Sequence, residues 1–370
     1  MKILILLSHT GGGHVAAARA VQEALHRIRP DVEVELRDGL VEGSPWPMNR
    51  SPALYSWAMR RGRMIYAFLW HLSNGPRRSR LMADLGGTRR LRGLLDEVDA
   101  DLVVSVHPLL TRSVLQALRA NGSRAPLAVV VTDLLTAHWS WFEPEVPLTL
   151  VPLEEVRRRA VAEGGMDPGR VRVTGQVVHP ESGEAVARRE ELRRSLGWDR
   201  PVVLLLAAGD GGGLIERHLH AAVDARLEAH LVMVCGRDRD LHTKLTGSSW
   251  ASTVEVHGFV NNLHELMAAA DILVTKAGPG SIMEGCVAGL PMLLYDRLPG
   301  QEVGNVQLVR ERGMGSFVQR PGDLMAALRA WLDDPAARAR AAEASKAAGV
   351  PDSATRIARE VLALLEGGAP

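Results

Sequence analysis

The sequence predicts an α/β protein built from two consecutive doubly wound domains, each a parallel sheet covered by helices. Short runs rich in Val, Ile and Leu alternate with amphipathic helical segments along almost the whole chain. At 370 residues the chain exceeds the usual size of a single core, so two domains of about 150–200 residues are expected. Glycine-rich turns follow several strands, and such sheets bind ligands beyond the carboxyl ends of their strands.

The predicted strands fall into two sets. The first lies at residues 2–7, 32–38, 101–108, 127–133, 148–152 and 171–175, and the second at 201–209, 229–236, 252–258, 271–278 and 290–296. Helices are expected at 14–28, 111–122 and 187–197. The predicted domains are therefore 1–176 and 177–348. A helix within 349–370, with Ser353 as its cap, is expected to pack back on the first domain.

Composition narrows the possible environments. The net charge of +1 predicts no global electrostatic steering. Cys235 and Cys286 lie far apart without metal-ligand spacing, which indicates a reducing compartment and no disulfide framework. The opening MKILILL is too short for a signal peptide, and no run approaches the roughly 18 apolar residues of a membrane-spanning helix. Any membrane contact is therefore expected to be peripheral.

The strongest chemical signal is the strand–loop–helix segment TKAGPGSIMEGC, residues 275–286. Gly278 and Gly280 let backbone N–H groups point outward, and Ser281 is placed to cap the helix that follows. Such a helix N-terminus stabilises a phosphate or diphosphate, and Glu284, one turn later, could accept hydrogen bonds from ribose hydroxyls. The alternative is a plain glycine turn between strand and helix.

Two neighbouring segments support a nucleotide-sugar site. Polar side chains suited to sugar hydroxyls follow the next strand, namely Gln301, Glu302 and Asn305. A second glycine loop, with Gly209, Gly211, Gly212 and Gly213, follows the strand at 201–209. It fits neither a dinucleotide fingerprint nor a Walker motif, but together the two loops predict two backbone nests converging on one diphosphate.

These motifs resemble those of the monogalactosyldiacylglycerol synthase and processive diacylglycerol glucosyltransferase family, which is related to the muramyl lipid-intermediate transferases. KAGPGSIMEGCVAGLP…PGQEVGNVQLV resembles the family's donor-binding signature, SHTGGGHVAAARAV its N-terminal glycine–histidine loop, and TDLLTAHWSWF its middle motif. The resemblance covers nearly the whole chain. It departs at Ala207, Ala208 and Asp210, where glycines and a glutamate are expected.

The resemblance implies a GT-B fold, two Rossmann-like domains facing across a cleft, and inverting transfer of galactose or glucose from UDP-galactose or UDP-glucose to diacylglycerol. It places uracil on the backbone at Phe259 and Val260, ribose on Glu284, and sugar hydroxyls on Gln301 and Glu302. The expected donor-binding set is Gly12, Gly13, Gly209, Asp210, Gly211, Phe259, Val260, Lys276, Gly278, Pro279, Gly280, Ser281, Glu284, Gln301, Glu302 and Asn305. No cofactor or metal is expected, because helix dipoles and glycine amides can bear the diphosphate charge.

The first domain is then expected to bind the acceptor and supply the base. Three glycines before His14 exceed the needs of a turn and indicate close approach of a ligand. Histidine titrates near neutrality, and a helix N-terminus lowers its pKa, so His14 is the predicted base; a mere helix-capping histidine is the alternative. Asp133 either orients His14, binds an acceptor hydroxyl or caps a helix. His107 is a second histidine at a strand end.

The acceptor path is predicted from aromatic and basic residues. His138, Trp139 and Trp141 are expected to line it, with ordinary packing as the alternative. Within residues 45–95, ten arginines face one acid, Asp84, and aromatic side chains are interleaved, which is typical of a segment at an anionic membrane surface. The expected contacts are Trp57, Arg60, Arg61, Tyr66, Trp70, Arg77 and Arg78. A solvated face or a nucleic-acid site is the alternative; no nucleic-acid partner is expected.

The combined prediction is a peripheral glycosyltransferase at the cytoplasmic face of the cell membrane. Two alternative functions are compatible with the same fold: a UDP-sugar epimerase or hydrolase, and a non-catalytic lipid-binding scaffold. The arginine–aromatic segment disfavours the first. The joint presence of His14, Glu284, Gln301 and Glu302 disfavours the second.

Overall fold

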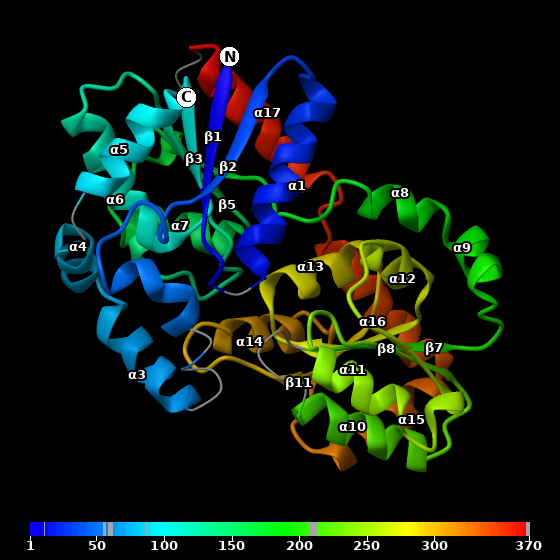
Figure 1. Ribbon diagram of the computed structural model, residues 1–370. Helices are drawn as coiled ribbons and strands as arrows, with labels where there is room; N and C mark the ends of the chain where they lie inside the picture. The colour runs from blue at the N-terminus through cyan, green and yellow to red at the C-terminus, as the bar shows by residue number, and fades with distance from the viewer. Residues whose placement is uncertain (11, 55–56, 58–61, 86–87, 208–212, 368–370) are drawn as a thin grey trace. The chain divides into compact units, whose positions relative to one another are not determined.

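The computed structural model describes residues 1–367 except 11, 55–56, 58–61, 86–87 and 208–212 (Figure 1). It forms two compact units. Unit 1 comprises Met1–Pro180, Pro299–Gln301 and Asp352–Pro370, and unit 2 comprises Glu181–Leu298 and Glu302–Pro351. Each unit contains a six-stranded, entirely parallel sheet in its described part. The predicted α/β class with two parallel sheets is confirmed.

The sheet of unit 1 has the strand order β2-β1-β3-β4-β5-β6. Its strands are β1 (Lys2–Leu7), β2 (Glu33–Asp38), β3 (Leu102–Ser105), β4 (Leu127–Val130), β5 (Leu148–Val151) and β6 (Val171–Val173). The helices are α1 (Gly13–Ile28), α3 (Arg63–Ser73), α4 (Pro76–Leu85), α5 (Arg89–Val98), α6 (Thr111–Ala120), α7 (Glu154–Ala162) and α17 (Ser353–Leu365). From β1 the chain first adds β2 on one side of β1 and then crosses to add β3 on the other side. The sheet's topological switch point therefore lies between β1 and β3.

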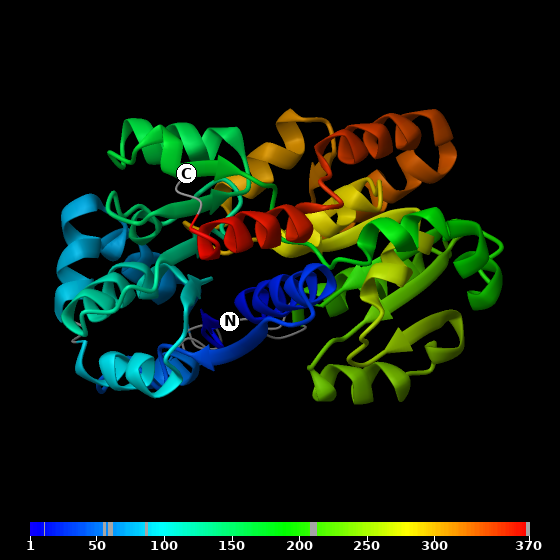
Figure 2. The ribbon, with the colours of Figure 1, turned by 90° about the horizontal axis from the view of Figure 1, so that it is seen from above.

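The core of unit 1 joins the two ends of the chain. Ile3 and Ile5 of β1 pack with α1 and with Ile357 of α17, while Leu4 and Leu6 point to the opposite face of the sheet. Figures 1 and 2 both show α17 alongside α1. The alanine-rich face of α1 allows this close packing. Ser353 does not cap α17 as predicted: it is the first helical residue, and its hydroxyl accepts a hydrogen bond from Val178 N at 3.2 Å.

The sheet of unit 2 has the order β12-β11-β10-β7-β8-β9. Its strands are β7 (Val202–Leu206), β8 (His230–Val234), β9 (Val254–His257), β10 (Ile272–Lys276), β11 (Met292–Asp296) and β12 (Gly315–Phe317). The helices are α8 (Ser182–Ala187), α9 (Arg189–Leu196), α10 (Gly213–Asp224), α11 (Arg239–Thr246), α12 (Leu263–Ala269), α13 (Pro279–Val287), α14 (Val303–Glu311), α15 (Pro321–Asp333) and α16 (Pro335–Ala348). Here the switch point lies between β7 and β10, so the segments that follow these two strands flank it.

Only one described strand was not predicted. β12 has three residues and pairs with β11 through Gly315, where a Cβ would overlap the carbonyl oxygen of Met292. A strand this short, which needs glycine for backbone approach, lacks the apolar run that revealed the others. No described helix is both long enough and apolar enough to span a bilayer.

Candidate active site

The loop after β1 is open where the glycines precede α1. A Cβ added at Gly12 or Gly13 would meet no described heavy atom within 4 Å, and neither glycine has a positive φ. Internal packing and backbone strain therefore do not require glycine at these positions among the described residues. Gly12 and Gly13 are both exposed.

His14, the second residue of α1, is held in one tautomer. Its Nδ1 lies 2.8 Å from the carbonyl oxygen of Val106 and 3.0 Å from the hydroxyl of Thr132. Because a carbonyl oxygen only accepts, Nδ1 carries the proton and Nε2 keeps its lone pair. Burial lowers the pKa of His14 below 6.5, although the charge of Asp133 and the bond to Val106 oppose this shift. His14 is thus a neutral imidazole with an acceptor nitrogen at neutral pH.

His107 lies beside His14, with the ring centroids 4.5 Å apart. The backbone N–H of Leu109 donates to His107 Nδ1 at 3.3 Å, so Nε2 carries the proton and donates to Thr10 Oγ1 at 2.9 Å. Burial, followed by the neighbouring His14, lowers the pKa of His107 well below 6.5. β1 and β3 deliver the two histidines to the switch point of the unit 1 sheet.

Asp133 follows β4 and does not orient His14 through a hydrogen bond, contrary to one of the predictions. Its Oδ2 accepts from the indole N–H of Trp141 at 2.8 Å and from His138 N at 3.1 Å. Its Oδ1 accepts from Nε2 of Gln301 at 2.7 Å. These described contacts hold the loop around Asp133 in place. The negative charge of Asp133 acts on His14 through space and favours a higher His14 pKa.

The aromatic residues of this loop do not all face outward. Trp141 is completely buried, so the structure assigns it to packing rather than to a surface path, because its indole N–H is needed by Asp133. Trp139 is half-buried, with the guanidinium of Arg159 5.2 Å from its ring. His138 is buried, with its Nε2 3.2 Å from the hydroxyl of Ser73, and burial lowers the pKa of His138 to about 4.

The predicted membrane contacts fall into two groups, one facing inward from α3 and one exposed to solvent. Tyr66 and Trp70 face inward: Tyr66 donates its hydroxyl to Gln301 Oε1 at 2.6 Å, and the ring of buried Trp70 lies 4.8 Å from that of His138. The fourfold spacing puts both on the packed face of the helix, so buried Trp70 cannot contact a membrane surface as predicted, whereas Tyr66 is half-buried. Trp57 is 46% exposed, and Arg77 and Arg78 are also exposed. Arg60 and Arg61 lie outside the described residues.

In unit 2, the loop after β10 leads directly into the N-terminus of α13. Gly278 precedes α13, and Pro279 is its first residue, so Ser281 is the third residue and not the predicted cap. Proline suits this first position because it has no N–H to satisfy and its φ is already helical. The amides of Gly280 and Ser281 belong to the first turn, where N–H groups have no intrahelical partner. A Cβ at Gly278 or Gly280 would meet no described atom within 4 Å.

Glu284 lies on α13, one turn into the helix. Its side chain is largely enclosed by protein, and burial raises its pKa to about 7. A carboxyl group with this pKa is partly protonated at neutral pH and gains from any ligand that donates hydrogen bonds to its ionised form.

Two of the predicted sugar-binding residues also support the loop itself. Glu302 is buried, accepts from Leu298 N at 2.6 Å and lies 3.4 Å from Lys276 Nζ. Burial raises the pKa of Glu302, and the Lys276 ammonium opposes the shift. Asn305 donates from Nδ2 to the carbonyl of Ala277 at 2.9 Å, while its buried Oδ1 has no partner among the described residues.

The remaining donor-binding predictions follow β9 and β7 in the sequence. Phe259 is 56% exposed, with the guanidinium of Arg237 5.2 Å from its ring, and Val260 is half-buried. Gly209, Asp210 and Gly211 lie outside the described residues.

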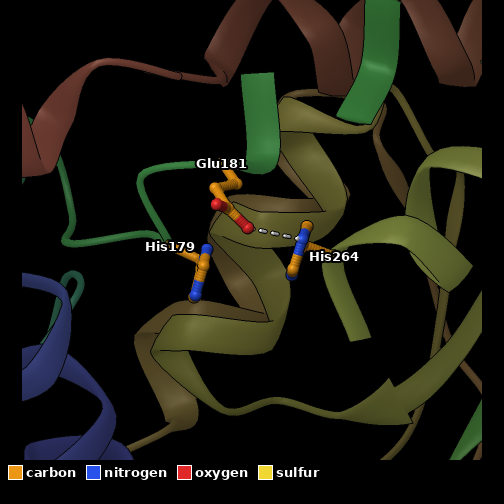
Figure 3. A group of neighbouring side chains, drawn as sticks. All are labelled: His179, Glu181 and His264. Atoms are coloured by element: carbon orange, nitrogen blue, oxygen red, sulfur yellow. Dashed lines mark ion pairs between the residues drawn. The ribbon is translucent and has the colours of Figure 1, made fainter. Parts of the chain in front are cut away.

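Elsewhere in unit 2, Glu181 and His264 form an ion pair at 3.3 Å, drawn in Figure 3. This pair links the residue before α8 to α12 within the unit. His179, also labelled in Figure 3, belongs to unit 1 and lies 3.7 Å from Glu23.

Sequence comparison gives two family matches that together follow this organisation. Residues 14–178 match the monogalactosyldiacylglycerol (MGDG) synthase family, and residues 213–357 match the glycosyltransferase family 28 C-terminal domain. A probable monogalactosyldiacylglycerol synthase 2 of Oryza sativa subsp. japonica is 34% identical over 347 residues, covering 89% of this chain and 73% of the relative. The chain belongs to the monogalactosyldiacylglycerol synthase family.

Other members of the monogalactosyldiacylglycerol synthase family are longer than this chain. The enzyme of Spinacia oleracea is 36% identical over 350 residues, covering 90% of this chain and 66% of the relative. Monogalactosyldiacylglycerol synthase 1 of Arabidopsis thaliana is 35% identical, with 90% and 64% covered. The chain therefore spans slightly less than two thirds of the length of these two relatives. All three names carry the description chloroplastic.

Solved structures confirm the GT-B-like fold of this monogalactosyldiacylglycerol synthase family member. The S. aureus MnaA–UDP complex has a TM-score of 0.64 at 15% identity, covering 99% of this chain and 97% of that chain. Acinetobacter baumannii MurG has a TM-score of 0.62 at 14% identity, covering 98% and 99%. At these identities the similarity concerns the fold alone.

Reasoning from sequence missed the groups that orient the histidines. Thr10, Thr132 and the Val106 carbonyl each follow a strand of the unit 1 sheet and were not singled out. The position of Thr10 shortly after the predicted strand 2–7 was an available signal, because polar residues there reach the same sheet edge. Thr132 was included in the predicted strand 127–133, so its place beyond the end of β4 was not visible. A backbone carbonyl carries no sequence signal at all.

Proposed function

We propose that this chain transfers galactose from UDP-galactose to diacylglycerol with inversion at the anomeric carbon, producing a glycolipid. Galactose rather than glucose is proposed because the curated relatives at 31–36% identity are named monogalactosyldiacylglycerol synthases. The structural observation that carries the proposal is the neutral His14, whose Nε2 lone pair is set by the bond from Nδ1 to Val106. A histidine in this state can accept a proton from an alcohol.

The proposed chemistry divides between the units. Unit 1 binds diacylglycerol, and His14 Nε2 takes the proton of its hydroxyl while that oxygen bonds to the anomeric carbon. The bond from this carbon to the diphosphate oxygen breaks, and UDP leaves with the electron pair. In unit 2, the first-turn amides of α13 and its helix dipole stabilise the charge that develops on the diphosphate.

Two further contacts of the donor are proposed from the geometry of unit 2, and one from the segment 299–301 of unit 1. Glu284 accepts hydrogen bonds from the ribose hydroxyls, and the backbone at exposed Phe259 and half-buried Val260 lies against uracil. Gln301 is proposed to contact the hexose. Because helix amides carry the diphosphate charge, transfer is proposed to need no metal, and an assay in excess EDTA tests this separately.

We propose that the protein docks on an anionic bilayer through a surface that we call the α3–α4 face. It consists of the exposed residues Met64, Ile65, Phe68, Leu69, Leu72, Arg77, Arg78, Arg80 and Leu81. Apolar side chains next to arginines suit the headgroup boundary, where each basic residue contributes about 1 kcal/mol. Diacylglycerol stays in the bilayer because each buried CH₂ contributes about 0.8 kcal/mol, so the enzyme has to reach it there.

The decisive experiment incubates the full chain with vesicles containing diacylglycerol and with radiolabelled UDP-galactose or UDP-glucose. The expected result is labelled glycolipid, formed faster from UDP-galactose. Labelled glycolipid from UDP-glucose alone would replace galactose by glucose in the proposal. Conversion of the UDP-sugars without labelled lipid would favour an epimerase or hydrolase, and no conversion at all would favour a lipid-binding scaffold.

A further inference from the structure

Helix α3 carries an inward face that contacts two loops of unit 1. Tyr66, Trp70 and Ser73 follow the spacing of one helical face. Ser73 and Trp70 contact His138, as described above, and the side-chain oxygen of Asn74, just after the helix, accepts from Trp139 N at 3.0 Å. These contacts hold α3 against the loop that contains Asp133.

The same face holds the three-residue segment 299–301, which belongs to unit 1. Gly300 has φ +87°, and a Cβ there would overlap the indole of Trp70. Glycine is therefore required for both the backbone conformation and the contact. Trp70 thus fixes the backbone of this turn directly before Gln301.

The side chain of Gln301 is held at both ends of its amide. Nε2 donates to Asp133 Oδ1 at 2.7 Å, and Oε1 accepts from the hydroxyl of Tyr66 at 2.6 Å. The Asp133 carboxylate also receives N–H groups from Trp141 and His138, so it acts as an acceptor toward all three partners. A flipped amide would place its carbonyl oxygen against the carboxylate and its NH₂ against the hydroxyl. Only one orientation satisfies the whole set.

We propose that Tyr66 is a positioning residue that fixes the amide orientation of Gln301 and thereby contributes to discrimination between hexose epimers. This inference rests on the proposed function, in which Gln301 contacts the hexose of the donor. Once oriented, Gln301 retains one N–H donor and one lone-pair direction on Oε1. Neighbouring sugar hydroxyls must match this pattern, and galactose and glucose differ in the direction of a single hydroxyl. Without the tyrosine hydroxyl, Asp133 still sets which amide atom faces it, but Oε1 loses its fixed position and the amide can shift toward either sugar.

The test is calorimetric titration of the full chain with UDP, UDP-galactose and UDP-glucose. Tyr66→Phe removes only the hydroxyl. We expect UDP affinity to stay within about twofold of wild type, UDP-galactose affinity to fall about three- to tenfold, and the ratio of the two UDP-hexose affinities to move toward one. Tyr295→Phe is the matched control, because its hydroxyl donates to the Leu206 carbonyl in unit 2 and the hexose ratio should not change.

A double-mutant cycle identifies the route through Gln301. If Tyr66 acts through Gln301, Tyr66→Phe combined with Gln301→Ala should match Gln301→Ala alone within about twofold. Three results would overturn the inference: an unchanged hexose ratio in Tyr66→Phe, additive losses in the double variant, or an equal loss of UDP and UDP-hexose affinity. A lowered melting temperature with the wild-type hexose ratio would likewise reduce Tyr66 to a structural role.

These measurements separate the inference from the proposed function. Binding is measured without lipid and without turnover, so failure to form glycolipid leaves the hexose ratio measurable. If Gln301→Ala binds UDP-galactose and UDP-glucose with wild-type affinities, Gln301 does not contact the hexose in a way that discriminates the epimers. That result contradicts the inference, whatever the transfer assay shows.

Discussion

At the scale of single residues, the structure shows how two adjacent histidines remain neutral. His14 and His107 each use one ring nitrogen in a hydrogen bond that sets the tautomer, and burial lowers both pKa values. A like charge 4.5 Å away would further oppose protonation of either ring. His14 is therefore available as a proton acceptor at neutral pH, with no need for a hydrogen-bonded carboxylate.

Replacement of His14 tests its proposed role as the base. His14→Gln should lower kcat by about 100-fold or more, because general-base catalysis contributes about 10²–10⁴-fold, while UDP affinity should stay near wild type. Because the His14 pKa lies below 6.5, wild-type turnover should be constant above that pH and fall only on the acid side. Glycolipid formation and UDP calorimetry measure these effects. Wild-type turnover in the variant would remove His14 from the reaction.

Glu284 offers a second residue-scale test. The ionised carboxylate is the better acceptor for ribose hydroxyls, so UDP binding should release about half a proton at pH 7 from a group with a pKa of about 7. UDP affinity should rise as the pH rises through 7. Calorimetry in buffers of different ionisation enthalpy measures the proton release. Glu284→Gln should weaken UDP binding about tenfold and abolish the release; proton release that persists in this variant would contradict the assignment.

At the scale of elements, α3 combines two surfaces with different partners. Its inward face holds the turn at 299–301, and its outward face presents Met64, Phe68 and Leu72 to solvent. Residues 66 and 68 are both aromatic and only two positions apart, yet they face opposite ways. Composition alone therefore could not separate exposed side chains from internally packed ones in this segment.

The α3–α4 face predicts a specific effect on vesicle binding. Combined Arg77→Gln and Arg78→Gln changes should weaken binding to anionic vesicles about tenfold or more, since each basic residue contributes about 1 kcal/mol. Flotation at increasing salt measures this electrostatic part. Phe68→Ser with Leu72→Ser should weaken binding at every salt concentration. Arg340→Gln, an exposed arginine on α16, is the matched control, and equal losses in the control would contradict a localised docking face.

At the scale of the whole molecule, the two units contain buried groups of opposite pH response. His14, His107 and His138 of unit 1 have lowered pKa values, so the stability tied to their neutral forms is present above about pH 6.5 and lost as the pH falls. Glu284 and Glu302 of unit 2 have raised pKa values, so the stability tied to their protonated forms is present below about pH 4.5 and lost as the pH rises.

This contrast predicts that acidification from pH 7 to 5 weakens unit 1 and strengthens unit 2. For His138 alone, with a folded-state pKa of about 4, the loss at pH 5 is about 2 kcal/mol. Amide hydrogen exchange measured on peptides from β3 reports the stability of unit 1, and exchange on peptides from β10 reports the stability of unit 2. Parallel changes in both units would contradict the prediction. His138→Asn should flatten part of the response of unit 1.

The sequence by itself determined the α/β class, eleven of the described strands and the family, because long buried strands and glycine loops are local patterns. Tertiary structure decided which side chains meet: Tyr66 with Gln301, Trp141 with Asp133, and His14 with the Val106 carbonyl. These partners are 235, 8 and 92 residues apart in the chain. Apolar periodicity shows that a residue is buried, but hydrogen-bond partners depend on strand order and on which helix face packs inward, and a one-dimensional pattern does not encode these.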